Sequence, residues 1–358
     1  MKEIYAIIIV FLTIISGCRN SSDQNTEPNA FITGEFKLDD IIFGETIELT
    51  GTPILSDIIF TPRHSHVIAN DSILVLRLSS TSNPYAFYIF RLPDFTPIGK
   101  VGRLGRGPLE FNSPLAVRTA DPTAIIYVRE FMTGKMYRLT KKYSLEEIRS
   151  SFTPLMIGAT GDNGIINISE DEYLYVNASR TKSKIVRTKY DKAIDQYNET
   201  ELLDLRFNPE IDIYMAYWGE LSANLSKDRM VFAYSYSPRI IFSNMKGDST
   251  RVLIFPGTEY DIRTREVPDG IDLNTLYYYN AIAGDKYLYL IYSGRDPKDT
   301  RNGIIYNMYI EQWDWNGNPL RRYKLDQYGY IDIDEKMGKI YLVGDVSEIP
   351  FYVYDLPK

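Results

Sequence analysis

Arginine is the residue type in this sequence that is best suited to recognise a partner. It recurs in segments between apolar runs, among them 102–111, 129–134, 177–184 and 293–303. Guanidinium groups bind planar anions through paired hydrogen bonds, so these segments predict a binding face for an acidic or carboxylate-bearing partner. The alternative is a set of solvated loops with internal ion pairs. The candidate residues are Arg103, Arg106, Glu110, Arg129, Arg180 and Arg295.

Aromatic residues supply a second kind of contact. The chain has 29 tyrosines, and many alternate with aliphatic residues, as in 287–290, which indicates packing within β-structure. Tyr217 and Trp218 stand outside such runs and are suited to stack on sugar rings or peptide side chains. We therefore include both in the predicted partner-binding set.

Residues for catalysis or metal binding are few. His64 and His66, the two histidines, would share one face of a strand, and no third ligand is indicated nearby. Asp332 and Asp334 offer two carboxylates where calcium takes 6–8 oxygen ligands, so this pair favours a hairpin turn. No Gly-x-Ser-x-Gly motif occurs. We predict no catalytic residue, no metal site and no cofactor.

The first residues have the features of an export signal. Residues 4–15 are apolar but fall short of the roughly 20 residues that span a membrane. Residues 15–18, Ile-Ser-Gly-Cys, resemble the lipobox of bacterial lipoproteins, which implies a signal peptide over 1–17 and lipidation of Cys18. The alternative is a buried cysteine in an N-terminal anchor helix. The polar residues that complete 18–34 predict a flexible tether.

Charge and compartment restrict the partners. A formal net charge of −7 argues against nucleic acid, because a phosphate backbone attracts basic proteins. The lipobox resemblance implies the cell envelope, as a lipoprotein of the outer membrane that contacts the membrane through Cys18. Residues 19–23 match poorly the acidic cluster that marks surface export, so the periplasmic and surface faces both remain open.

A short phrase recurs six times along the chain. Each copy has a turn residue, one or two small or polar residues, and then a run rich in apolar residues and tyrosine. Successive copies start between 50 and 57 residues apart. That period with β-type units is typical of a propeller, in which each repeat forms one blade of about four strands. The copies begin at Asp71, Asp121, Asp171, Asp228, Asp285 and Gly338.

The predicted fold is therefore all-β, a six-bladed propeller of four-stranded antiparallel blades over residues 35–358. The sixth blade has only three candidate strands, at 330–334, 340–343 and 351–356. We expect residues 36–49 to supply the missing outer strand, so that an N-terminal strand closes the ring and protects its edge. The alternative is a seven-bladed ring, with additional strands within 150–165.

Residues 102–114 resemble a known propeller pattern. The sequence Gly-Arg-Leu-Gly-Arg-Gly-Pro-Leu-Glu-Phe-Asn-Ser-Pro is similar to the glycine-rich turn and Phe-x-x-Pro of NHL-type propellers. In its Gly-x-Gly-Pro-x-Glu-Phe form it resembles the TolB-like six-bladed propeller lipoproteins of Bacteroidetes. The glycine motif occurs clearly once, and the resemblance implies fold and compartment more than activity. A structural role in the passage between blades explains most of its residues.

Together these features predict a lipid-anchored binding or scaffold protein of the envelope. Its loop face would hold a protein, peptide or glycan partner. The alternative is a metal-dependent lactonase or lyase with its site in the central channel, as in other six-bladed propellers. A third interpretation is a purely structural envelope scaffold.

Overall fold

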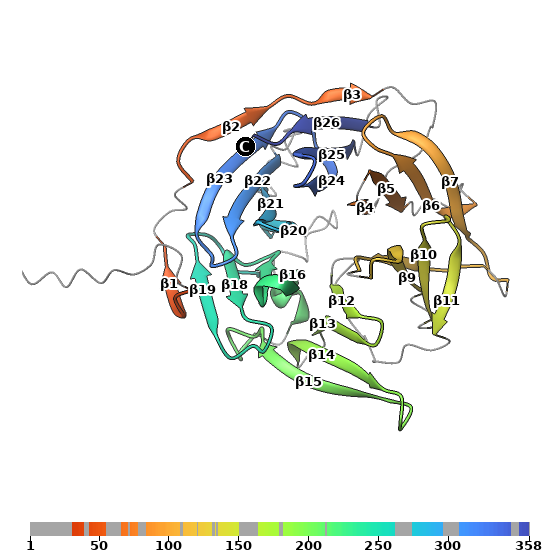
Figure 1. The fold of residues 1–358 in the computed structure, drawn as a ribbon. Helices are drawn as coiled ribbons and strands as arrows, with labels where there is room; N and C mark the ends of the chain where they lie inside the picture. The colour runs from red at the N-terminus through yellow and green to blue at the C-terminus, as the bar shows by residue number, and fades with distance from the viewer. Residues whose placement is uncertain are drawn as a thin grey trace, which may run out of the picture. The chain divides into compact units, whose positions relative to one another are not determined.

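The computed structural model divides the chain into two units, residues 1–32 and 33–358. It describes residues 31–38, 43–54, 66–70, 72–77, 84–107, 110–119, 121–130, 133, 135–149, 164–178, 182–211, 213–261, 274–295, 308–344 and 351–357. In these ranges no helix is both long and apolar enough to cross a membrane. The second unit is a six-bladed β-propeller (Figure 1).

The blades follow one another along the chain, and the four strands of each blade pair antiparallel from the inner strand outward. Blades 1 to 3 comprise β4 (His66–Asn70), β5 (Ile73–Arg77), β6 (Tyr85–Arg91), β7 (Thr96–Arg103); β8 (Pro114–Val117), β9 (Ala124–Glu130), β10 (Met136–Thr140), β11 (Leu145–Arg149); and β12 (Ile165–Ser169), β13 (Glu172–Ala178), β14 (Ser183–Asp191), β15 (Gln196–Asp204).

Blades 4 to 6 continue the pattern, with two short 3₁₀ helices beside the inner strand of blade 4. They comprise η1 (Tyr214–Tyr217), β16 (Gly219–Asn224), η2 (Leu225–Lys227), β17 (Arg229–Tyr234), β18 (Arg239–Ser243), β19 (Thr250–Ile254); β20 (Leu276–Ala283), β21 (Tyr287–Arg295), β22 (Met308–Asp314), β23 (Pro319–Leu325); and β24 (Gly329–Asp334), β25 (Lys339–Gly344), β26 (Phe351–Asp355).

The six recurring apolar runs are the second strands of the blades, as predicted. All seven residues of β9 are buried, and five of the six in β25 are buried. A second strand is covered by a neighbouring blade on each face, which explains a continuous apolar run where a half-exposed strand would alternate. The buried clusters accordingly join adjacent blades: one packs Leu74 and Phe90 of blade 1 against Tyr341 and Phe351 of blade 6.

An N-terminal strand closes the ring, but the closing segment differs from the predicted one. The outer strand of blade 6 is β3 (Thr52–Ile54), which pairs antiparallel with β26. The predicted segment 36–49 instead contributes to β1 (Gly34–Lys37) and β2 (Thr46–Leu49), which add parallel fifth strands to blades 4 and 5. A three-residue strand with proline at its centre is a weak sequence signal, although an edge strand tolerates proline.

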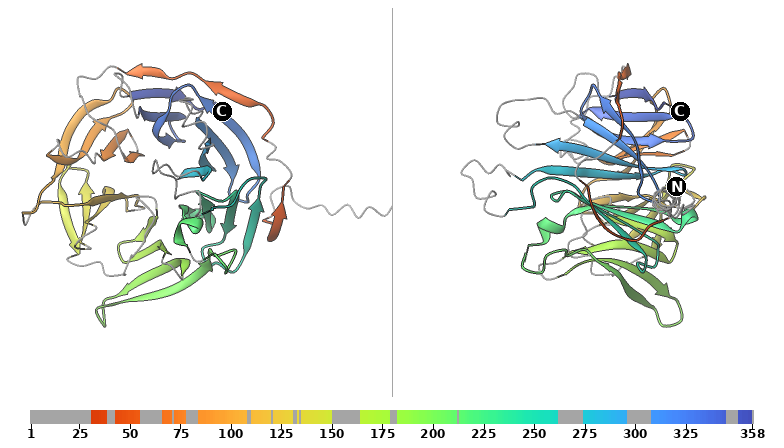
Figure 2. Two further views of the ribbon diagram at one scale, coloured as in Figure 1. Left: turned by 180° about the vertical axis from the view of Figure 1, so that it is seen from behind. Right: turned by 90° about the vertical axis from the view of Figure 1, so that its left-hand side faces the viewer.

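The three N-terminal strands run along the outer rim of the ring, as Figure 2 shows from behind. We call residues 33–54 the N-terminal belt. Phe43 lies between β1 and β2, is 7% exposed, and its ring meets that of Trp313 at 5.1 Å between centroids. The belt thus covers the outer edges of three blades and adds an aromatic contact to blade 5.

The seven-bladed alternative is wrong, because the described residues form six sheets. Residues 150–163, where we allowed for extra strands, lie outside the described ranges, as do Cys18, His64 and Arg180. The tyrosine-rich runs pack between blades as expected, and Tyr234, Tyr289 and Tyr354 are at most 1% exposed.

Candidate functional site at the propeller axis

Polar side chains on the inner strands join neighbouring blades around the axis. Most of these hydrogen bonds connect an amide or carboxylate on one inner strand to the backbone or a side chain of the next blade. They therefore hold the inner strands in place around the axis. The pairs are Thr119 Oγ1 with Asn167 Oδ1 at 2.6 Å, Asn224 Nδ2 with Gly284 O at 3.0 Å, Asn280 Nδ2 with Ile331 O at 3.3 Å, and Asp332 Oδ2 with Ala69 N at 2.5 Å.

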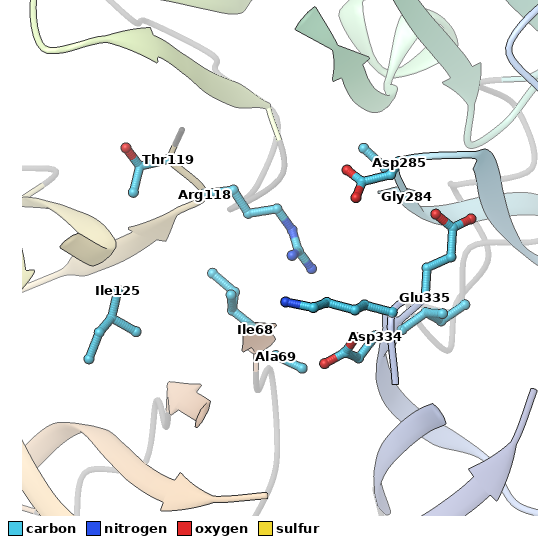
Figure 3. A pocket seen from close by; sticks show the side chains of 12 residues that line it. Ile68, Ala69, Arg118, Thr119, Ile125, Gly284, Asp285, Asp334 and Glu335 are labelled. Carbon is cyan, nitrogen blue, oxygen red and sulfur yellow. The ribbon is translucent and has the colours of Figure 1, made fainter. Parts of the chain in front are cut away.

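A cavity of about 330 Å³ opens where four inner strands end and their turns begin. We call it the axial cavity (Figure 3). Blades 1, 2, 5 and 6 line it, and its walls combine branched aliphatic side chains with groups of both charges. Its volume is in the range of small-ligand sites. The lining residues are Ile68, Ala69, Arg118, Thr119, Ile125, Ala283, Gly284, Asp285, Ile333, Asp334, Glu335 and Lys336.

Arg118 is the central cation of this cavity. It follows β8 directly, after the buried residues Ala116 and Val117, and its guanidinium extends from blade 2 into the cavity (Figure 3). One of its nitrogens, Nη2, donates to Oδ1 of Asp332. The Arg118 side chain remains 35% exposed, whereas Asp332 is fully buried. A buried carboxylate therefore orients the guanidinium while leaving part of it accessible to a ligand.

Asp332 ties together three blades. It lies on β24 of blade 6, accepts the Ala69 backbone N–H of blade 1 through Oδ2, and accepts Arg118 of blade 2 through Oδ1. Without these partners a carboxylate at 0% exposure would be strongly unfavourable. Asp332 is thus a positioning residue for Arg118.

Asp334 ends β24, and Glu335 begins the hairpin turn that the pair Asp332 and Asp334 predicted. Asp334 Oδ1 accepts the Met337 N–H at 2.9 Å, and Gly338 adopts a φ of 63° that suits glycine, as a tight hairpin requires. Glu335 accepts the backbone N–H groups of Lys286 and Tyr287 at 2.7 and 3.0 Å, so its carboxylate holds the first turn of blade 5.

The glycine-rich segment between β7 and β8 holds itself together. Arg103 Nε lies 3.4 Å from Glu110 Oε1, and Glu110 Oε2 accepts the Gly107 N–H at 2.9 Å. A Cβ on Gly105 would lie 1.9 Å from Glu110 Oε2, so a larger residue there would displace this carboxylate from its present position. Phe111 is 6% exposed and packs in the cluster shared by blades 1 and 2. Arg106 is exposed on the same segment.

The other predicted partner-binding residues are dispersed. Arg129 lies within β9 at 4% exposure, and burial lowers the pKa of its guanidinium to about 10. Tyr217 is 1% exposed in η1 and donates its hydroxyl to Ile211 O at 3.1 Å, which makes it part of the core. Trp218 is half-buried with its ring 6.2 Å from that of Tyr214. Arg295 ends β21, and its side chain lies outside the described set.

The axial cavity lies at the opposite end of the strands from the predicted loop face. That face consists of blade-to-blade links and second-to-third strand links, whereas the cavity is formed by first-to-second strand turns. The sequence analysis names Asp332 and Asp334 but not Arg118. The one sequence signal for Arg118 is a charged residue directly after a short apolar strand. Among the described residues, no group of three His, Cys, Asp or Glu side chains has the arrangement of a metal site.

Comparison with known proteins gives one family, and many solved structures share the fold, of which two are described here. The family described as TolB-like 6-blade propeller-like matches residues 43–336. A search of curated proteins returned no significant match. A Bacteroides fragilis protein described as exported is 13% identical with a TM-score of 0.53, over 89% of this chain and 97% of its own. A DUF4221 family member from Bacteroides vulgatus is 10% identical with a TM-score of 0.56, over 88% and 97%. At these identities the likeness shows the fold alone.

Proposed function

Because the chain belongs to the TolB-like six-bladed propeller family, we propose that it is a lipid-anchored binding protein of the bacterial cell envelope. Cys18 carries the anchor, and the propeller holds a protein, peptide or glycan partner through an anionic group bound at Arg118. The observation that carries the proposal is the guanidinium of Arg118, which Asp332 holds in place at the wall of a 330 Å³ cavity.

Arg118 suits this role better than the arginines of the loop face. Arg103 is 69% exposed with its Nε 3.4 Å from Glu110 Oε1, so its guanidinium is held less firmly than that of Arg118, and Arg129 is buried within its blade. Arg118 combines partial exposure with a fixed orientation, so binding an anion there costs little side-chain entropy. The axial position also suits binding, since all the strands around it are braced by neighbouring blades.

The anchor is tested by replacing Cys18 with serine in the full chain. We expect the variant to lose incorporation of labelled fatty acid and to leave the membrane fraction, because one thiol carries the whole acyl attachment. Fractionation of cells that express the wild type and the variant measures this. Unchanged membrane association and labelling would rule out the anchor.

The binding site is tested by in-cell cross-linking and pull-down of the full-length protein. Arg118→Gln is expected to lower partner recovery about tenfold or more, which is the usual effect of losing a charge-assisted hydrogen bond. Arg118→Lys keeps the positive charge but loses the paired hydrogen-bond donors of the guanidinium. Recovery of the partner with this variant should therefore be intermediate. Arg91→Gln, at an exposed arginine that ends β6 and does not line the cavity, is the matched control and should bind normally.

Equal recovery with Arg118→Gln and the wild type would contradict the proposed site. A thermal melt of each variant separates lost binding from lost structure, because Asp332 loses its partner in Arg118→Gln. The lactonase or lyase alternative is tested on the same samples. It requires one bound divalent ion per chain and an activity that a chelator abolishes.

A further inference from the structure

Acidic side chains are concentrated on one side of the axial cavity, and that side also contributes Lys336. Arg118 enters from blade 2, while the carboxylates of Asp285 and Asp334 stand on the side formed by blades 5 and 6 (Figure 3). Aliphatic side chains of Ile68 and Ile125 line part of the wall between them. An anion bound at Arg118 would therefore extend toward two carboxylates.

Asp285 is exposed but sits on a firmly held turn. Its backbone carbonyl accepts Asn224 Nδ2 at 3.2 Å, and the Gly284 carbonyl accepts both Asn224 Nδ2 at 3.0 Å and Trp315 Nε1 at 3.3 Å. Glu335 holds the other side of the same turn through two backbone N–H groups. The turn is thus fixed by blades 4 and 6 together, which presents the Asp285 carboxylate in a defined place.

Asp334 is fixed in a similar way. It ends β24, two residues after Asp332, and its Oδ1 accepts the Met337 N–H. That bond occupies one carboxylate oxygen and sets the orientation of the group. A carboxylate held in this way can accept a further donor through its other oxygen without losing side-chain entropy.

The lining of the cavity carries charges of both signs, with Arg118 and Lys336 as the cations. Glu335 keeps its negative charge while it accepts backbone N–H groups of blade 5, and Asp285 and Asp334 are the two other anions. A ligand with a single charge would face a wall of its own sign. A ligand that carries both charges satisfies both walls.

From this arrangement we propose that the axial cavity recognises a dipolar ligand of the amino-acid or short-peptide class. Its carboxylate binds Arg118, and its ammonium group binds Asp285 and Asp334. The proposal rests on the proposed function, which it extends by naming the ligand class. It also gives the acidic side of the cavity a role in recognition.

The test compares two probes that differ only in the ammonium group. L-Alanyl-L-alanine and N-acetyl-L-alanyl-L-alanine are titrated calorimetrically into the full chain, purified in detergent. We expect the free dipeptide to bind about tenfold or more tightly than the acetylated one, since one charge-assisted contact is lost. Asp285→Asn and Asp334→Asn should weaken binding of the free dipeptide by a similar factor and leave the acetylated one unchanged. Asp94→Asn, on an exposed turn of blade 1, is the matched control.

The outcomes separate this inference from the proposed function. If Arg118→Gln abolishes binding of both dipeptides while the wild type binds them equally, the anionic site stands and the dipolar ligand is overturned. If the aspartate variants bind the free dipeptide as the wild type does, the ammonium site is likewise overturned. If neither dipeptide binds the wild type, both this inference and the carboxylate role of Arg118 are contradicted.

Discussion

Deletion of the N-terminal belt, residues 33–54, is expected to leave no cooperatively folded propeller. The deletion removes the outer strand of blade 6 together with the fifth strands of blades 4 and 5. It opens the ring and exposes three strand edges, and it also removes Phe43 from its contact with Trp313. We expect these losses together to outweigh the stability of a typical domain, which is roughly 5–15 kcal/mol. Circular dichroism melts and size-exclusion chromatography of the purified chain measure the outcome.

Two further variants show which part of the belt matters. Deletion of residues 19–29, which lie within the predicted tether 18–34, is the matched control and should leave the melting transition unchanged. Phe43→Ala removes one buried ring and should cost about 3–5 kcal/mol while retaining the fold. A belt deletion that still melts cooperatively at the wild-type temperature would show that the ring holds without its N-terminal strands.

The fold could be predicted from the sequence because each blade contains the same local sequence pattern. A turn residue followed by a run such as 124–130 indicates a strand buried on both faces, and six copies of this pattern indicate six blades. Ring closure was predicted by counting strands in the last blade. The closing strand was assigned to the wrong segment, because Thr52–Ile54 is short and contains proline, whereas 45–49 alternates convincingly.

The site was far less predictable, because it depends on contacts between distant residues. Arg118 and Asp332 lie 214 residues apart and meet only when blade 6 closes against blade 1. Local sequence also misplaced Arg129, which seemed to begin a loop but pairs with Leu115 and Met136 inside its blade. Tyr217 is a second example, because the residues beside it in the sequence do not show that its side chain is buried in η1. Strand register, which no local motif shows, decides which polar residues face the axis.

Arg322→Met is expected to destabilise the propeller by about 3–5 kcal/mol at neutral pH, because it leaves a buried carboxylate without its cation. Glu311 is fully buried on β22, and its Oε1 lies 2.5 Å from Nη2 of Arg322 on β23. Burial raises the pKa of Glu311, and Arg322 opposes that rise. The guanidinium also lies over the ring of Phe43, at 4.8 Å, so the same pair helps to hold the belt.

The pH dependence of this variant has a definite sign. Without Arg322 the pKa of folded Glu311 rises further above its unfolded value near 4.5. A carboxyl whose folded pKa is raised contributes its stability below the unfolded pKa and loses it as pH rises through the folded pKa. The deficit of Arg322→Met relative to the wild type should therefore be smallest near pH 4.5 and grow toward neutral pH. Urea unfolding across this range measures it.

A double variant separates the buried charge from the lost packing. Glu311→Gln combined with Arg322→Met removes the stranded carboxylate, so it should recover much of the stability and lose the pH dependence. Lys339→Met, which breaks the exposed pair with Asp355, is the matched control and should cost less than about 1 kcal/mol. If the double variant is as unstable as Arg322→Met, the destabilisation comes from lost ring packing, and if it is also equally sensitive to pH, Glu311 is not the group that needs Arg322.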